Sequence, residues 1–300
     1  MLPPALNQLK EKIDVALDGY LPRQSDIAQP VVDAMRHSVL GGGKRLRPML
    51  VCAATEACGG NIEHALAPAC ALEFVHAYSL IHDDLPAMDD DDIRHGLASA
   101  HIAFGEANAI LAGDSLHSLA FQNIALSNYH SGDVKLAMIS LLSADAGWAG
   151  MAGGQCLDIQ SEGHTLDLER LKQMHAAKTG ALIRCSLQIG ALSAHNISCK
   201  EAPFSDEQMQ YLIKFGNLIG LAFQVMDDVL DVTQTTDKLG KPAGSDEQQN
   251  KNTFPKLMGL NEAKSYAHEL VQQAHQVLHG SGLQTATLAA LAQLVVDREF

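Results

Sequence analysis

Long apolar runs, paired cysteines and aromatic side chains are all scarce in this 300-residue sequence. No run of eighteen apolar residues occurs, which argues against a membrane-spanning helix. The six cysteines are scattered without any CxxC spacing, as is typical of free thiols in a reducing compartment. The N-terminus has no basic start followed by an apolar core, so it does not predict an export signal. These absences predict a soluble, cytoplasmic protein without a membrane partner.

Positive charge is also in short supply. Lys and Arg number 21 against 35 Asp and Glu, so the formal net charge is -14. A chain of this charge repels nucleic acid and anionic membranes, and we expect no nucleic-acid partner. Any anionic substrate must therefore be held by local cations or by a bridging metal ion.

Sustained alternation of polar and apolar residues is absent as well, so strands are not expected. Apolar residues recur instead at helical spacing, and 47% apolar composition can bury a large core. The sequence predicts an all-α protein with a single domain over residues 1–300. The expected helices cover residues 4–20, about 30–40, about 47–58, 63–82, 101–127, 133–160, 167–194, 205–234, 260–279 and 285–297.

A first acidic cluster follows the apolar helix that ends near residue 82. Asp83 and Asp84 close this helix, and a break containing a proline leads to the run Asp89 to Asp92. Two carboxylates about 4 Å apart repel by roughly 4 kcal/mol at an effective dielectric of about 20. Oxygen ligands without a nearby cysteine indicate Mg²⁺, Mn²⁺ or Ca²⁺. The run Asp89 to Asp92 on its own is more typical of a solvated loop.

A second acidic cluster interrupts another apolar helix. Asp227 and Asp231 are four residues apart, so they share one helix face, with Asp228 beside them. Three unpaired charges inside an apolar helix would be prohibitively costly to bury. This cluster therefore indicates a bound metal or a set of cations.

A basic turn follows three consecutive glycines. Lys44, Arg45 and Arg47 gather at the start of a helix, where cations oppose the helix dipole unless an anion binds. Free backbone N–H groups and forked guanidinium donors make such a turn a phosphate site, although a solvated basic loop is the simpler alternative. With the two acidic clusters, it describes a site for a diphosphate bridged by metal.

The three segments together resemble the motifs of the short-chain trans-prenyl diphosphate synthases, most closely the bacterial farnesyl type. Asp83 to Asp89 resembles the first aspartate-rich motif, Asp227 to Asp231 the second, and Gly42 to Pro48 the turn that holds isopentenyl diphosphate. The resemblance runs from about residue 10 to the C-terminus. It implies a bundle of about ten helices around a central cavity, a homodimer, and about three Mg²⁺ ions per site, for which Mn²⁺ can substitute.

The resemblance also implies a reaction and a set of site residues. The reaction is the condensation of isopentenyl diphosphate with dimethylallyl or geranyl diphosphate to (2E,6E)-farnesyl diphosphate, by ionisation, condensation and proton elimination. The implied metal ligands are Asp83, Asp84, Asp89, Asp227, Asp228 and Asp231. The implied substrate-binding residues are Lys44, Arg47, His76, Arg94, His95, Lys178, Gln224, Lys241 and Lys251, and the implied catalytic residues are Lys178, Thr179 and Gln224.

Two positions bear on specificity. Tyr78, followed by the small Ser79, lies about one helical turn before Asp83, and a turn of 5.4 Å is close to one isoprene unit. Tyr78 is therefore expected to form the floor of the pocket and to limit product length. His95 stands where the family usually has a second Arg. A largely neutral imidazole predicts weak affinity for isopentenyl diphosphate, improving as the pH falls toward 6.

Other functions compete with this interpretation. Within the family, the alternatives are a geranyl or geranylgeranyl diphosphate synthase and a non-catalytic partner subunit of such a synthase. Outside it, His82 and Asp83 could belong to a metal phosphohydrolase, and Glu73 with His76 forms one ExxH pair of the kind found in di-iron bundles. A class I terpene cyclase would share the first acidic motif, but it has no use for the basic turn.

Overall fold

The structure is a computed structural model that describes residues 2–198, 201–233 and 251–297. Within these ranges no helix has both the length and the apolar character needed to cross a membrane. The predicted substrate-binding residue Lys241 lies outside the described residues.

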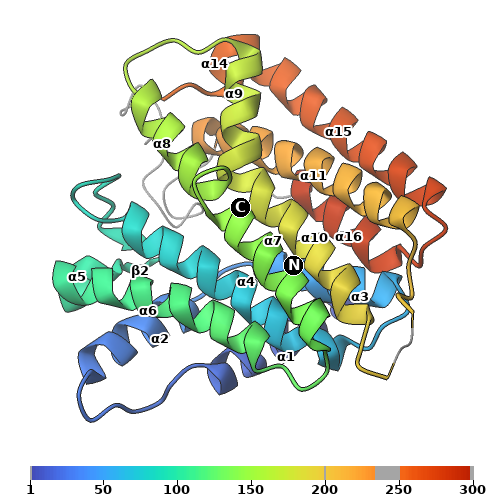
Figure 1. Cartoon of the computed structure of the whole chain (residues 1–300). Coiled ribbons are helices and arrows are strands. Elements are labelled where there is room, and N and C mark those ends of the chain that lie inside the picture. Colours follow the sequence, from blue (N-terminus) through green and yellow to red (C-terminus); the bar gives the residue numbers. More distant parts are fainter. Residues whose placement is uncertain (1, 199–200, 234–250, 298–300) are drawn as a thin grey trace.

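The described residues are mostly helical, with one two-stranded hairpin, which confirms the predicted all-α class (Figure 1). The helices are α1 (Pro4–Tyr20), α2 (Gln29–Leu40), α3 (Leu46–Ala57), α4 (Ile62–Asp83), α5 (Ala100–Phe104), α6 (Glu106–Ala125), α7 (Gly132–Ala146), α8 (Met151–Ser161), α9 (Leu168–His175), the π-helical η1 (Ala176–Gly180), α10 (Ala181–Ala194), α11 (Asp206–Thr233), α14 (Phe254–Met258), α15 (Leu260–Gly280) and α16 (Ala286–Val296). One short antiparallel hairpin joins β1 (Ile93–Arg94) to β2 (Leu97–Ala98).

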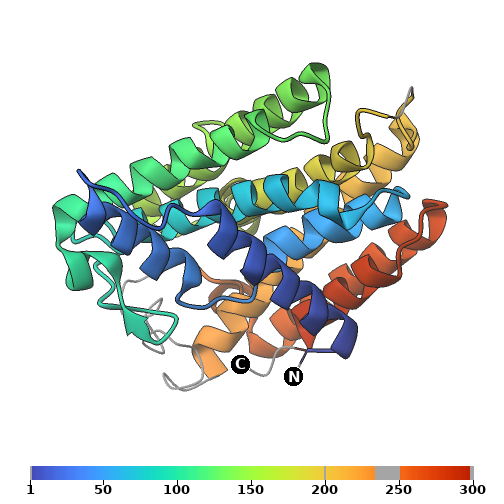
Figure 2. The ribbon, with the colours of Figure 1, turned by 90° about the horizontal axis from the view of Figure 1, so that it is seen from below.

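Helix α4 forms the centre of the bundle. Most of its residues from Ala65 to Ile81 are buried, because apolar side chains occur all round the helix and not along one stripe. It packs against α6 and α3, and also contacts α1, α2, α7 and α10. Helices α1 and α2 lie on the outer side of α3 and α4 when the molecule is seen from below (Figure 2). The helix that ends at Asp83 is thus held by neighbours on several sides.

A second group of helices carries the other acidic cluster. Helix α11 packs against α10 and η1 on one side and against α15 and α16 on the other.

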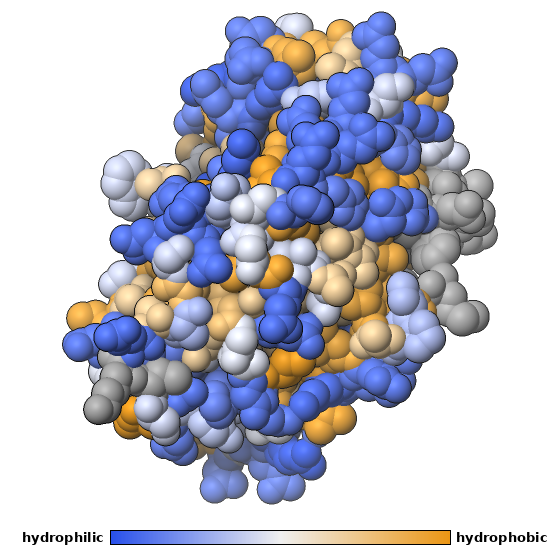
Figure 3. Space-filling model, turned by 90° about the vertical axis from the view of Figure 1, so that its right-hand side faces the viewer, coloured by the Kyte–Doolittle hydropathy of each residue, from blue (hydrophilic) through white to orange (hydrophobic). Residues whose placement is uncertain are grey.

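On the face seen in Figure 3, hydrophilic side chains cover most of the surface, with apolar patches between them.

Three of the expected helices are interrupted. The predicted helix 101–127 breaks at Gly105, whose φ of 83° is unfavourable for other residues. The predicted helix 133–160 ends at Ala146 and restarts at Met151, with Gly147 and Gly150 between.

The hairpin was not expected, because its two-residue strands are too short to show alternation. Its turn places His95 and Gly96 at positive φ.

The third interruption is the π-helical segment η1, inside the predicted helix 167–194. Helix α8 lies directly against it, since a Cβ atom added to Gly154 would collide with the backbone nitrogen of Lys178 and come within 2.8 Å of the carbonyl carbon of Ala177. Only glycine allows this approach. Single π-helical turns occur frequently at functional sites.

Glycine also sets the distance between α3 and α10. A Cβ atom at Gly190 would overlap the carbonyl oxygen of Val51 and lie 2.7 Å from the Cβ of Ala54. We predict that Gly190→Ala lowers the free energy of unfolding by about 1–3 kcal/mol, because the two backbones must separate. Gly19→Ala is the matched control in α1, where nothing lies within 4 Å of the added Cβ; it should stabilise the protein by about 0.5–1 kcal/mol. Urea denaturation measures both, and equal effects would contradict the packing argument.

Candidate active site

Two adjoining cavities open beside the carboxyl end of α4. One, of about 320 Å³, has mostly polar walls and is called the polar cavity; the other, of about 520 Å³, has mainly apolar walls and is called the apolar cavity. Both are lined by Arg47, His76, Leu80, Asp83, Lys178 and Thr179. A molecule with a charged head and an apolar tail would fit across this boundary.

The two acidic clusters meet in the polar cavity. Asp83 and Asp89 line it from α4 and the following loop, while Asp227 and Asp228 line it from α11. Burial raises the pKa of Asp83 to about 6, and the negative charge of Asp89 reinforces the shift, although Lys178 opposes it. The pKa of Asp83 stays raised because the effect of burial exceeds that of the nearby cations.

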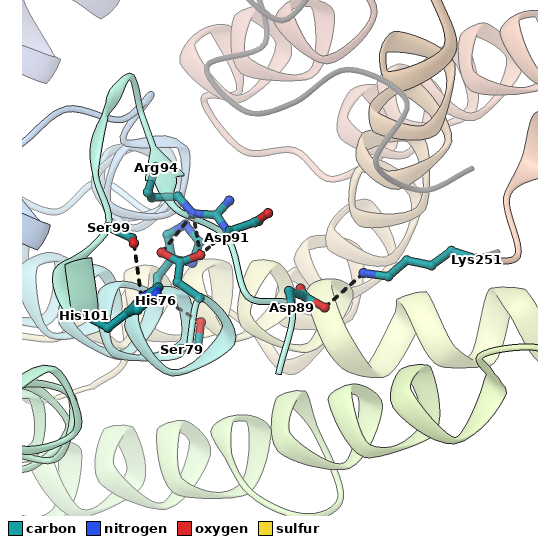
Figure 4. Close-up of polar contacts among 9 residues, drawn as sticks. His76, Ser79, Asp89, Asp91, Arg94, Ser99, His101 and Lys251 are labelled. Atoms are coloured by element: carbon teal, nitrogen blue, oxygen red, sulfur yellow. Dashed lines mark hydrogen bonds and ion pairs between the residues drawn. The ribbon is translucent and has the colours of Figure 1, made fainter. Parts of the chain in front are cut away.

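Arg94 holds part of the first cluster. Its Nε donates to Oδ1 of Asp84 over 3.0 Å, and its Nη2 donates to Oδ2 of Asp91 over 3.0 Å (Figure 4). Burial raises the pKa of Asp84 and the bond from Arg94 opposes this shift. Asp84 is 2% exposed and does not line the polar cavity, whereas Arg94 does. Asp84 therefore acts on the cavity through Arg94.

Two lysines face the acidic groups of the polar cavity. Lys251 Nζ lies 3.2 Å from Oδ1 of Asp89, bridging the C-terminal part of the chain to the first acidic loop (Figure 4). Lys178 Nζ, on η1, lies 2.6 Å from Oδ2 of Asp158 on α8. Asp158 was not among the predicted site residues. In the sequence it is visible only as a polar residue within an otherwise apolar helix.

Gln224 is oriented by hydrogen bonds at both ends of its amide. Its Nε2 donates to Oδ2 of Asp227 over 3.2 Å, and its Oε1 accepts from Nδ1 of His175 over 3.1 Å. His175 is a further lining residue that the sequence did not single out. These contacts fix the amide in the wall of the polar cavity, which Thr179 also lines.

The rest of the second motif also carries structural contacts. Oδ2 of Asp228 accepts a hydrogen bond of 2.9 Å from the backbone N–H of Phe254, which ties α11 to α14. Asp231 is buried on α11 and does not line the polar cavity.

The basic turn divides into two parts. Arg47 lines both cavities, and Lys44 is exposed at the turn. Arg45 instead points into the core: it is 5% exposed, with its Nε 2.8 Å from Oδ1 of Asp14, its Nη1 2.8 Å from Oε1 of Glu73 and its Nη2 bonded to the carbonyl oxygen of Val39. The expectation that Arg45 belongs to the phosphate-binding cations is therefore wrong.

Arg47 is a cation in the walls of both cavities that has an unsatisfied donor. Its Nε is buried and has no hydrogen-bond partner in the described ranges. Burial lowers its pKa, while Glu73 and Asp227 oppose the shift. Burial also lowers the pKa of His76 well below its usual value, with Arg47 adding to the effect, so His76 is neutral near pH 7. A buried guanidinium beside a neutral imidazole is suited to hydrogen-bonding a diphosphate.

His95 lines the polar cavity from the hairpin turn. Partial burial, the guanidinium groups of Arg94 and Arg45 and the ammonium group of Lys44 lower its pKa to about 4. Because the imidazole of the free protein is then neutral at pH 6, the structure does not support the expected gain of affinity on acidification to pH 6. The cause is the surrounding positive charge, which the sequence alone does not place.

The carboxylates fit a magnesium ion that arrives with its substrate. Among the described residues, no three Asp, Glu, His or Cys side chains converge to hold a metal ion by themselves. Mg²⁺ is usually held in proteins by one or two carboxylates together with water and substrate phosphates. Asp83 and Asp89 on one wall and Asp227 and Asp228 on the other supply such a set.

The apolar cavity contains the two residues predicted to limit chain length. Tyr78 and Ser79 both line it. The ring of Tyr78 meets that of His117 edge to face, with ring centroids 4.9 Å apart. Tyr78 is therefore supported from behind by α6.

Comparison with known proteins identifies the family. The sequence model of the polyprenyl synthetase family matches residues 28–286. The chain belongs to this family. It is 45% identical to farnesyl diphosphate synthase of Escherichia coli over 99% of this chain and 98% of that protein, and 43% identical to a chloroplastic geranylgeranyl pyrophosphate synthase of Capsicum annuum over 89% and 71%.

The fold agrees with solved polyprenyl synthetases. The structure of a geranyltransferase from Helicobacter pylori complexed with magnesium and isoprenyl diphosphate superposes with a TM-score of 0.85, at 31% identity, over 99% of this chain and 97% of that one. The predicted all-α prenyl synthase fold and prenyltransferase class are thereby confirmed. The phosphohydrolase, di-iron and terpene cyclase alternatives are set aside.

Glu73 should anchor the basic turn through Arg45. We predict that Glu73→Ala lowers the free energy of unfolding by about 3 kcal/mol, because it leaves the buried Arg45 guanidinium one carboxylate short. Glu73→Gln keeps a hydrogen-bond acceptor and should cost less. Glu63 lies on α4 like Glu73, and its exposed carboxylate pairs with Lys12. Glu63→Ala should therefore lower the free energy of unfolding by less than about 1 kcal/mol. Urea denaturation ranks the three variants, and similar losses in all of them would disprove the anchoring role.

Proposed function

We propose that this polyprenyl synthetase is a Mg²⁺-dependent farnesyl diphosphate synthase, which condenses isopentenyl diphosphate with dimethylallyl or geranyl diphosphate. The observation that supports it most is that Asp83 and Asp227, from opposite parts of the chain, line one cavity adjoining an apolar cavity. Two relatives, from Escherichia coli and Haemophilus influenzae, are farnesyl diphosphate synthases, which supports this product.

The cations divide between two diphosphate positions. Arg47, His76 and His95, with Lys44 at the turn, bind isopentenyl diphosphate. The allylic diphosphate is bound by Arg94, Lys178 and Lys251, and also by Lys241, which lies outside the described residues. In a protein with a net charge of -14, these local donors must overcome the mean repulsion of an anionic substrate.

The metal ligands follow from the walls of the polar cavity. Asp83 and Asp89 would hold Mg²⁺ on one side and Asp227 on the other, with Asp84, Asp228 and Asp231 behind them. Family resemblance implies about three ions, and Mn²⁺ can substitute. When bound, Mg²⁺ neutralises the charge that develops on the departing diphosphate.

The side chains then support ionisation and condensation. Lys178, Lys251 and Arg94 bind the diphosphate as the bond between C1 and oxygen breaks, and so stabilise the leaving group. Thr179 and Gln224 present oxygen atoms to the allylic carbons. The apolar cavity excludes water, so the double bond of isopentenyl diphosphate attacks C1 through its C4 atom. A proton leaves C2, passing to the released diphosphate, and no side-chain nucleophile is required.

Four broader properties complete the proposal. Residues 1–300 form one polyprenyl synthase domain, since α4 and α10 contact helices from both halves of the chain. The protein is cytoplasmic. It is a homodimer, for which exposed apolar side chains on and after α6, including Ile110, Leu111 and Leu126, supply a surface. A non-catalytic partner subunit is disfavoured because all six motif aspartates are present.

Incubation of the purified protein with Mg²⁺, isopentenyl diphosphate and either dimethylallyl or geranyl diphosphate tests the function. We expect farnesyl diphosphate from both allylic substrates and no turnover after chelation of Mg²⁺. Asp83→Asn and Asp227→Asn should each lower kcat by about 10²–10³-fold, since each removes charge stabilisation of the leaving group. Asp133→Asn, at an exposed position of α7, should leave the rate unchanged. A protein that consumes no isopentenyl diphosphate would refute the proposal.

The floor of the apolar cavity should decide product length. We predict that Tyr78→Ala gives geranylgeranyl diphosphate as a main product, because removal of the ring opens about one helical turn, 5.4 Å, of additional depth. Tyr78→Phe keeps the ring against His117 and should retain the farnesyl product. Chromatography of the dephosphorylated products measures the distribution, and the same distribution in all three proteins would remove Tyr78 from this role.

A further inference from the structure

Lys251 reaches the polar cavity from a stretch of chain without regular secondary structure. It lies just before α14, and residues 251–253 form neither helix nor strand. Its Nζ nevertheless lies 3.2 Å from Oδ1 of Asp89, and its side chain is only 15% exposed (Figure 4). A lysine side chain is long and flexible, so a fixed position of its ammonium group requires that other contacts hold its backbone.

The side chain of the next residue, Asn252, ties this stretch to the connection between α8 and α9. Its Oδ1 accepts a hydrogen bond of 2.9 Å from the backbone N–H of Leu166. Its Nδ2 donates to the carbonyl oxygen of His164 over 2.8 Å and, more weakly, to that of Ser161 over 3.4 Å. These partners precede Asn252 by 86 to 91 residues, so the amide joins two distant parts of the chain.

A second attachment lies beyond Asn252. The backbone N–H of Phe254 donates to Oδ2 of Asp228 over 2.9 Å. Phe254 is three positions after Lys251, whereas Asn252 is its direct neighbour and is 8% exposed. Asn252 is therefore the nearer of these two attachments to Lys251.

We infer that Asn252 is a positioning residue for the allylic diphosphate. Asn252 lines the polar cavity, but both ends of its amide already have partners, so it acts through Lys251 and not by contact with the substrate. The amide holds the backbone that carries Lys251 and keeps Nζ at the cavity before the substrate arrives. A preorganised cation binds an anion at a smaller entropic cost than a mobile one. This inference rests on the proposed function.

The effect of Asn252 should be confined to one of the two diphosphate positions. Arg47 and His76, proposed to bind isopentenyl diphosphate, lie within α3 and α4, where helical hydrogen bonds hold their backbones. Lys251 lies outside any helix. Loss of the Asn252 amide should therefore weaken binding of the allylic diphosphate and leave binding of isopentenyl diphosphate unchanged.

The test measures binding and turnover separately. Calorimetric titration in the presence of Mg²⁺ should show that Asn252→Ala binds the non-reacting geranyl S-thiolodiphosphate about five- to tenfold more weakly than the unmodified protein, the loss expected for a displaced contact with a charged group. In turnover, the KM for geranyl diphosphate should rise by a similar factor, while the KM for isopentenyl diphosphate changes less than about twofold. Asn252→Ser keeps one hydrogen-bonding group, should lose less affinity, and serves if the alanine variant does not fold.

An exposed asparagine provides the matched control. The side chain of Asn61 caps the N-terminus of α4 by accepting a hydrogen bond of 3.0 Å from the backbone N–H of Glu63. Asn61→Ala makes the same chemical change and lowers stability through loss of the cap. It should leave the affinities for both substrates as they are in the unmodified protein.

A double variant tests whether Asn252 acts through Lys251. Lys251→Ala alone should weaken binding of the thiolodiphosphate about tenfold. Adding Asn252→Ala to it should weaken binding by less than about twofold more, because two residues that act through one contact do not have additive effects.

Three results would overturn the positioning role without affecting the proposed function. They are unchanged thiolodiphosphate binding in both Asn252 variants, an equal rise of both KM values, and additive losses in the double variant. If the unmodified protein itself formed no prenyl product and did not bind the thiolodiphosphate, the proposed function would fail first, and the inference with it.

Discussion

The burial of carboxylates around one cavity is the constraint on which this site depends. Asp83, Asp89, Asp227 and Asp228 line the same polar space, within a chain whose net charge is already strongly negative. Burial raises the pKa of Asp83, the negative charge of Asp89 adds to the shift and Lys178 opposes it. Such a site favours positive charge beside its carboxylates, and Arg47, Lys178 and Lys251 in the same walls supply part of it.

The scaffold that maintains this arrangement is built from closely packed backbones. Helix α4 is apolar on all sides and is therefore held by neighbours around its circumference. Glycine allows α8 to touch η1 at Gly154 and α10 to touch α3 at Gly190. These contacts leave little freedom for the walls of the two cavities, and a preorganised wall is what stabilisation of a short-lived cation needs.

Much of this architecture could be predicted from the sequence, because it depends on local patterns. Apolar spacing located the helices, and the two aspartate clusters and the glycine-rich turn located the ends that carry chemistry. The remainder depends on tertiary contacts. The partner of Lys178 proved to be Asp158, twenty residues away in the chain, and Arg45 turned inward to Asp14 and Glu73. Neither the left-handed backbone at Arg45 nor the cationic surroundings of His95 has a local sequence signal.

Helix α4 carries, on one rigid element, a support for the basic turn and side chains that line both cavities. Glu73 supports the basic turn, Tyr78 lines the apolar cavity and Asp83 lines the polar one. The five residues from Tyr78 to Asp83 advance about 7.5 Å along the axis at 1.5 Å per residue. Tyr78 lines the apolar cavity and not the polar one, whereas Asp83 lines both. A substitution at Tyr78 therefore alters the volume open to a hydrocarbon chain while the carboxylates of the polar cavity keep their places.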